Sequence, residues 1–183
     1  MKTSHVLLLI GAALGWAGQA VAQQPAPESK TVYQQAMDAA EAAYDAAKAR
    51  CDALAGVPHE ICVADARAAR VRIEEEAGAA YKNTLAAYTQ ARMRIASAYY
   101  ERDRTRCGAA LGNDREVCER QAKATLVASQ ADARADRKAI EARLEAQDAR
   151  IDAEYRVALQ KCDAFAGDVK EGCVSTTRTA YGK

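Results

Sequence analysis

The residues in this sequence that are most able to do chemistry are its six cysteines, which fall into three pairs of identical spacing. Cysteine thiolates can join as disulfides, bind zinc or copper(I), or attack electrophiles. The three pairs are Cys51 with Cys62, Cys107 with Cys118, and Cys162 with Cys173. Which of these chemistries applies depends on the cell compartment and on the elements that hold each pair.

Each cysteine pair belongs to a longer motif that the chain repeats three times. A tyrosine precedes the first cysteine, and a glycine and a glutamate lie between the two cysteines, always at the same spacing. The copies are Tyr44, Cys51, Gly56, Glu60, Cys62; then Tyr100, Cys107, Gly112, Glu116, Cys118; then Tyr155, Cys162, Gly167, Glu171, Cys173. Five positions recurring together indicate an internal repeat, in which one structural unit is used three times.

Few other residues in the sequence could carry catalysis. Beyond the first 22 residues the only histidine is His59, beside Pro58, and no serine lies in a nucleophile turn. The chain has no glycine cluster for phosphate, and its carboxylates are spaced as on solvated helix faces. We therefore expect no catalytic residues, no cofactor and no metal site, and predict that the protein is not an enzyme.

The first residues have the layout of a cleaved secretory signal. Lys2 precedes an apolar stretch from Val6 to Ala17, and Ala20 and Ala22 form a small-residue cleavage site. We predict a signal peptide at 1–22 cleaved after Ala22, a disordered leader at 23–28, and one helical repeat domain at 29–183. No later segment approaches the roughly 20 apolar residues of a transmembrane helix, so no integral membrane span is expected.

Export to an oxidising compartment favours disulfides within the three cysteine pairs. A metal site built from Cys51, Cys62, Cys162 and Cys173 is the alternative, although structural zinc sites usually use cysteines two to four positions apart. The chain has 26 Lys and Arg against 25 Asp and Glu, and Lys2 leaves with the signal. Since the charge of the mature chain is then balanced, we expect no nucleic-acid binding.

The glycine of each repeat predicts a tight turn between two helices. Gly56, Gly112 and Gly167 each follow a helix-forming run and suit the left-handed conformation that closes a helix. Asn113 with Glu116, and Asp168 with Glu171, have the spacing of capping boxes, with Glu60 as the equivalent glutamate of the first copy. The cysteines of each pair lie symmetrically about the turn, so they should face each other across a helical hairpin.

The fold class predicted is all-α, with antiparallel helical hairpins of coiled-coil or bundle type built from three disulfide-stapled helix-turn-helix repeats. Tyr44, Tyr100 and Tyr155 lie on the same stripe as their cysteines, opposite small residues, and are expected in the repeat core. Aromatic residues at this spacing could also form a binding stripe, but they are more often core.

Between one turn and the next the sequence has no proline and, apart from Gly78, no glycine. This favours two long helices, at about 57–111 and 113–166. Shorter outer helices are expected at about 29–55 and 168–181. This topology brings the first and third turns together in a four-helix bundle and leaves a two-helix arm tipped by the second turn. Such an arm would either pair with another copy or a partner, or fold back through breaks near Gly78 and Ser129.

The repeat resembles a family of exported alanine-rich proteins of Gram-negative bacteria that are often labelled TolA-like cell-envelope proteins. The resemblance is carried by Cys-Asp-Ala-Leu-Ala-Gly at 51–56, Cys-Val-Ala-Asp-Ala-Arg at 62–67, Cys-Asp-Ala-Phe-Ala-Gly at 162–167 and Tyr-Gly-Lys at 181–183. It implies a periplasmic location and no particular activity.

These observations favour a non-enzymatic periplasmic protein that acts through protein–protein contacts, in an envelope-associated or scaffold role, with protein partners or self-association. A chaperone-like holdase is the first alternative, because an uncovered apolar arm could bind unfolded clients. A thiol-based metal or redox protein is the second.

Overall fold

The computed structural model describes residues 27–183, which fold into five α-helices and contain no strand. The helices are α1 (Lys30–Cys51), α2 (Gly56–Lys82), α3 (Leu85–Cys107), α4 (Gly112–Cys162) and α5 (Gly167–Ala180). Alanine, the best helix former, makes up much of every long helix. The all-α class is therefore confirmed, whereas the signal peptide and leader residues 23–26 lie outside the described residues. Glu28, the last residue of the predicted leader, makes a backbone hydrogen bond to α2: its N–H donates to the carbonyl of Ala80 (3.4 Å).

The three repeat turns share one backbone geometry, as the sequence repeat predicts. Each helix ends at the first cysteine of its pair, and the N–H of the third residue beyond donates to that cysteine's carbonyl. The bonds are Leu54 to Cys51 (2.8 Å), Ala110 to Cys107 (3.1 Å) and Phe165 to Cys162 (3.1 Å). The glycine that opens the next helix has a φ of 62°, 55° or 56° at Gly56, Gly112 and Gly167, the left-handed conformation expected from its position.

The capping boxes predicted after these glycines are not formed. Helices α4 and α5 begin at Gly112 and Gly167 themselves, and their N-cap residues, Leu111 and Ala166, make no side-chain capping bond. Asn113 and Asp168 therefore lie one residue inside the helix, where a side chain can no longer act as the N-cap. The role left to Asp168 in the first turn is to place negative charge near the positive end of the helix dipole.

The helix predicted at 57–111 is wrong, because the chain turns back at Asn83 and Thr84. Asn83 has a φ of 45° and closes α2, and the Thr84 hydroxyl accepts a hydrogen bond from the N–H of Ala87 (3.1 Å) to begin α3. Gly78 lies inside α2, and Ser129 lies inside the continuous α4. The first break thus occurs five residues beyond the glycine that was expected to mark it, and the second does not occur.

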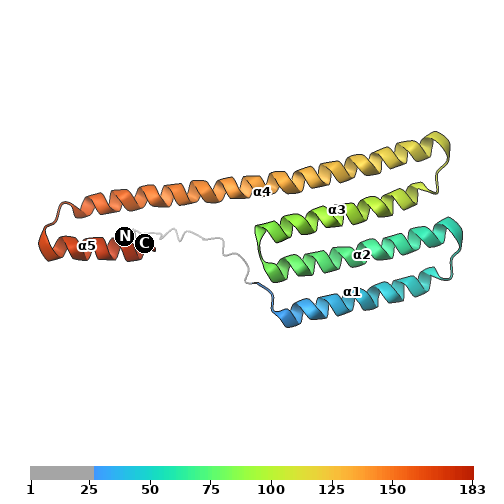
Figure 1. Cartoon of the computed structure of the whole chain (residues 1–183), viewed down its shortest axis with the longest axis horizontal. Coiled ribbons are helices and arrows are strands. Elements are labelled where there is room, and N and C mark those ends of the chain that lie inside the picture. The colour runs from blue at the N-terminus through green and yellow to red at the C-terminus, as the bar shows by residue number, and fades with distance from the viewer. Residues whose placement is uncertain (1–26) are drawn as a thin grey trace, which may run out of the picture.

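The helical hairpins form a layer one helix thick, and not the predicted four-helix bundle with a two-helix arm. Contacts join α1 to α2, α2 to α3, α3 to α4 and α4 to α5, and no other pair of helices in the described chain is in contact. Figure 1 shows α1 to α4 side by side, with α5 alone beneath the C-terminal end of α4. Because α3 runs back along α2, the first and second stapled turns share one end of the layer. The prediction that the first and third turns meet is therefore wrong.

Small residues form the core of this layer. The residues buried between helices are mostly alanine and cysteine, with Leu126 the largest apolar side chain among them. Tyr44, Tyr100 and Tyr155 are only half-buried, since one layer offers no closed interior to a large ring. Their rings contact Arg70 (5.4 Å), Lys123 (5.3 Å) and Tyr181 (5.6 Å), respectively. The repeated tyrosines thus cover the edges of the hairpins and do not fill a core.

Replacing Gly112 by alanine should lower the free energy of unfolding by about 1–2 kcal/mol, because an L-residue is strained in the left-handed conformation. Apart from the adjoining residues and the nearby backbone of the helix itself, no atom lies within 4 Å of the added Cβ, so the cost comes from the backbone conformation. Gly78→Ala is the matched control: this glycine is inside a helix with equally open space, and alanine there should stabilise the protein by about 0.5–1 kcal/mol. Opposite shifts of the two urea midpoints would verify the turn, and equal shifts would refute it.

Candidate functional site

All six cysteines lie within the described residues, where they form three disulfides that staple the hairpins. The Cα atoms of each pair are 5.6, 5.6 and 5.7 Å apart, in the range that a disulfide requires. The first cysteine of each pair, Cys51, Cys107 or Cys162, is fully buried. The predicted pairing is confirmed, and the described chain holds no free thiol.

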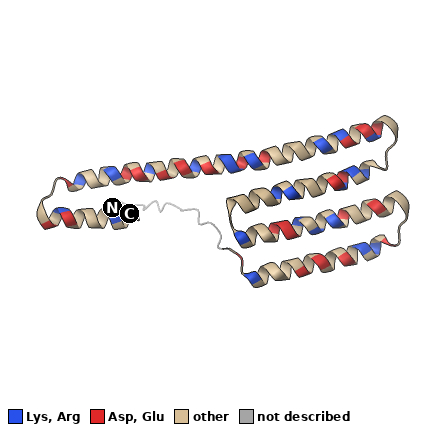
Figure 2. Cartoon of the chain, viewed as in Figure 1, with Lys and Arg blue, Asp and Glu red and all other residues tan. Residues whose placement is uncertain are grey.

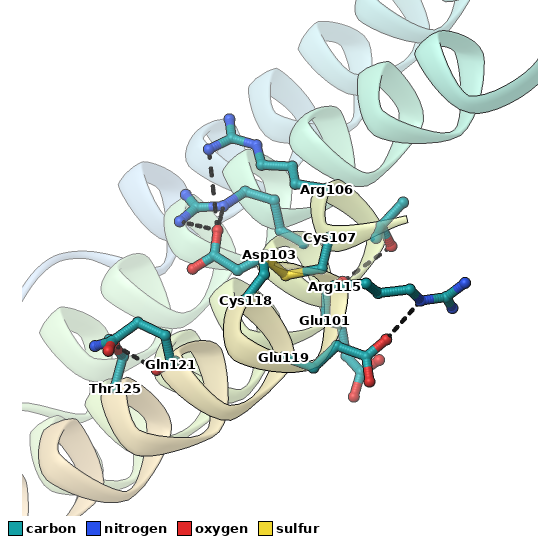
Figure 3. The surroundings of a disulfide bond; sticks show 11 residues. Glu101, Asp103, Arg106, Cys107, Arg115, Cys118, Glu119, Gln121 and Thr125 are labelled. Carbon is teal, nitrogen blue, oxygen red and sulfur yellow. Dashed lines mark hydrogen bonds and ion pairs between the residues drawn. A yellow bond between two sulfur atoms is a disulfide. The ribbon is translucent and has the colours of Figure 1, made fainter. Parts of the chain in front are cut away.

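The cysteines considered as an alternative metal site are not brought together. Cys51 and Cys62 join α1 to α2, whereas Cys162 and Cys173 join α4 to α5 at the far end of α4. Figure 3 shows the remaining disulfide, Cys107–Cys118, between α3 and α4. Ion pairs lie beside it, including Arg115–Glu119 (3.0 Å). These surroundings are those of a structural staple.

A groove of about 650 Å³ runs along the seam between α2 and α3. Its lining contains apolar side chains, charged side chains, two hydroxyl residues and one histidine. We call the apolar lining residues the floor: Val63, Ala64, Val71 and Ala98. We call the charged lining residues and the histidine the rim: His59, Glu60, Arg67, Glu101 and Arg102. The groove stays open because no further helix of the described residues covers this seam.

Ion pairs fix the two walls of this seam relative to each other. Arg106 donates to Asp65 (2.8 Å) and Arg94 donates to Glu75 (3.1 Å), each bond linking α3 to α2. Arg102, on the rim, donates to Asp103 (2.8 Å), and this hydrogen bond raises the pKa of the guanidinium. Since an arginine with a raised pKa stays charged at all physiological pH values, Arg102 can attract anions but cannot transfer protons.

His59 lies at one end of the groove, in the first turn of α2. Its Nε2 is 3.8 Å from Oδ1 of Asp52, and its side chain is 39% exposed. Two hydroxyl residues, Ser97 and Thr105, also line the groove. Each donates to a backbone carbonyl of its own helix, Ser97 to Met93 (3.1 Å) and Thr105 to Glu101 (3.0 Å).

The other residues singled out from the sequence lie apart from this groove, with one exception. Glu60 is on its rim, while Glu116 is 3.9 Å from Arg120 and Glu171 is exposed on α5. Sequence reasoning missed the groove itself, because its walls meet only when the chain turns back at Asn83. The signal that could have revealed it is the pair Asn83–Thr84, a left-handed residue followed by an N-cap residue.

Charge is distributed evenly over the described helices. Figure 2 shows Lys and Arg interspersed with Asp and Glu along α1 to α4, and no broad face of one sign appears in this view. At the far end, Lys183 donates to Asp152 (2.7 Å), which lowers the pKa of Asp152 and raises that of Lys183. This exposed contact is therefore lost as the pH falls through the lowered pKa of Asp152, or rises through the raised pKa of Lys183.

In the part of the chain that the structure describes, no helix is both long enough and apolar enough to cross a bilayer. Comparison with known proteins adds no relative: no family model matches the chain, and no curated protein or solved structure shows significant similarity to it.

Proposed function

We propose that this chain is a non-enzymatic periplasmic protein that acts through protein–protein contacts as an envelope-associated scaffold. The observation that carries the proposal is the one-layer arrangement, in which each helix contacts only its neighbours in the chain. Such a layer exposes both broad faces over its whole length, a form typical of proteins that present extended binding surfaces. Three disulfides support a location in an oxidising compartment.

The groove between α2 and α3 favours binding over chemistry. Active sites are usually concave pockets that bury most of a substrate and shift the pKa values of their acids and bases. This groove is open to solvent, and its rim arginine Arg102 is engaged by a neighbouring carboxylate. A lining that combines apolar with charged side chains is instead compatible with a protein contact, since interfaces use both kinds of residue.

In-cell photo-crosslinking tests the proposal. A photo-reactive residue placed at Val63, on the groove floor, should capture a small set of defined proteins in the native periplasm. The matched control is Val169, an apolar residue of α5 that is 64% exposed and distant from the groove. Defined partners at Val63 that are missing at Val169 support a scaffold, and equal capture at both positions would overturn it.

The holdase alternative is tested by the same captured proteins. The half-covered apolar residues Val63 and Val71 could hold exposed segments of unfolded clients. A holdase should capture a broad set of proteins in proportion to their abundance, and the purified chain should suppress aggregation of a reduced test protein. The thiol-based alternative requires a free thiol, whereas the described cysteines are all in disulfides.

A further inference from the structure

No other helix of the described chain covers the middle of α4. Helix α3 lies along its first part and α5 along its last part, and residues 142–150 between them are exposed on every side. None of residues 142–149 makes an ion pair within the described chain. A polar helix stands alone in water when many pairs four residues apart support it, so this stretch lacks the support that a free-standing spacer needs.

The side of α4 that faces away from α3 and α5 is also uncovered, and it is lined by small residues. At 100° per residue, a position two residues after a buried one lies on the opposite side of the helix. The buried residues of this part of α4 are Ala122, Leu126 and Ala133. The positions two residues after them, on the opposite side, are Ala124, Ala128 and Ala135. The outer face is completed by further exposed alanines: Ala131, Ala139, Ala142, Ala146, Ala149 and Ala153.

The charges that border this outer face reverse sign about Ala142. One border carries Asp132 and Arg150, which are 18 residues or five full turns apart. The other border carries Lys138 and Glu145, which are seven residues apart. Asp132, Lys138 and Glu145 make no ion pair in the described chain, and Arg150 is 3.6 Å from its nearest carboxylate, that of Glu154. Between residues 131 and 153, each border therefore carries one sign before Ala142 and the opposite sign after it, while Arg156, five turns after Lys138 on the same border, lies beyond this span.

This arrangement matches a second copy of the same helix running in the opposite direction. With a two-fold axis at Ala142, Lys138 faces Glu145 of the second copy and Asp132 faces Arg150, and the symmetry forms each pair twice. Ala131 then lies opposite Ala153, and Ala135 opposite Ala149. Small residues at these levels let the two helix axes approach to the lower end of the usual 8–10 Å.

We propose that the outer face of α4 binds a second copy of this chain, as an antiparallel pair centred on Ala142. Helix α4 is the edge of the layer in Figure 1, so the rest of each copy points away from the pair. The contact covers one side of the bare stretch at 142–150. This inference concerns a different surface from the groove and does not depend on the proposed function.

Charge reversal tests the pairing. The protein with its three disulfides intact should be a dimer in analytical ultracentrifugation. Lys138→Glu should raise the dissociation constant of the dimer at least tenfold, because it places two glutamates opposite each other. Glu145→Lys should do the same, and the double variant K138E/E145K should restore the dimer. Asp148→Lys is the control, because it changes the same kind of charge on an exposed residue away from the outer face. Circular dichroism of each variant checks that the helices are intact.

Self-crosslinking tests the direction of the pair. A cysteine at Ala142 lies on the two-fold axis and should form a disulfide with its own copy, whereas cysteines at Ala131 would be about 33 Å apart in the antiparallel pair. A parallel pair would crosslink both variants. A monomer at the highest attainable concentration, failure of the double variant to restore the dimer, or crosslinking through Ala131 would each overturn the proposal.

Discussion

Removing the third disulfide, through Cys162→Ser with Cys173→Ser, is expected to release α5 from the rest of the molecule. This helix has 14 residues, none of them buried, and it contacts only α4. An isolated helix shorter than about 12–15 residues is marginal in water. The disulfide closes the loop between Cys162 and Cys173, which are 11 residues apart. In the chain-entropy model, closing a loop of this length contributes on the order of 3 kcal/mol, so the disulfide is the main restraint on α5.

Few other contacts would hold α5 in place. The rings of Tyr155 and Tyr181 are 5.6 Å apart and tilted, and the Lys183–Asp152 ion pair is exposed. Exposed ion pairs contribute little, with a median of about 0–1 kcal/mol. Hydrogen exchange of residues 167–180 should therefore become as fast as in an unfolded peptide, with a loss of helical ellipticity that corresponds to this helix alone.

The matched control is Cys107→Ser with Cys118→Ser in the second hairpin. Here α3 and α4 also pack through Ala96, Ala122, Leu126 and Ala133, all buried, and α2 supports α3 from its other side. This variant should keep its helix content and hydrogen-exchange protection while its melting temperature falls. Retained protection of α5 in the first variant would mean that packing on α4, and not the disulfide, holds the helix.

The stapled turns could be predicted from the sequence because their determinants are local. A glycine with positive φ, a cysteine on either side at symmetric spacing and a helix-forming run before it all act within a dozen residues. The same information recurs three times, so a wrong reading of one copy would conflict with the other two. Hairpins and disulfides therefore followed from spacing alone.

The arrangement of the hairpins could not be predicted with the same security, since it depends on one helix break that lacks the strongest signals. Asn83 takes the left-handed conformation at the end of α2 without glycine, and Thr84 begins α3 without proline. Asparagine is the second choice at such a position, so Gly78 attracted the prediction instead. Because the break reverses the direction of α3, it decides which turns are neighbours and whether a groove exists between α2 and α3.

The final shape of the layer depends on the uncovered part of α4, and a proline there should have a large effect. Gln147 is exposed in the stretch where neither α3 nor α5 covers the helix, and it lies away from the outer alanine face. Gln147→Pro removes one helical hydrogen bond and places its ring against the carbonyl of Arg143, at a cost of about 3 kcal/mol or more. The helix should break at this point.

The break should separate two bodies that each stay folded. The layer from α1 to the first part of α4 keeps its contacts and two disulfides, and the α4–α5 hairpin keeps the third. For the monomer, at concentrations below that of the proposed dimer, small-angle scattering should change from that of one elongated particle to that of two mobile bodies, with little change in the melting temperature of the layer. Gln147→Ala is the control and should scatter as the unaltered chain does.

The same variant distinguishes a single helix from a paired one. In an antiparallel dimer the second copy of α4 runs across residue 147 and splints the broken helix, so Gln147→Pro alone should change the scattering only slightly at dimer concentrations. Adding Ala142→Arg, which places two arginines on the two-fold axis, should separate the copies and reveal the full effect. Mobile bodies from Gln147→Pro at every concentration would show that nothing covers the middle of α4, and an unchanged profile in the double variant would show that α4 is stiff without a partner.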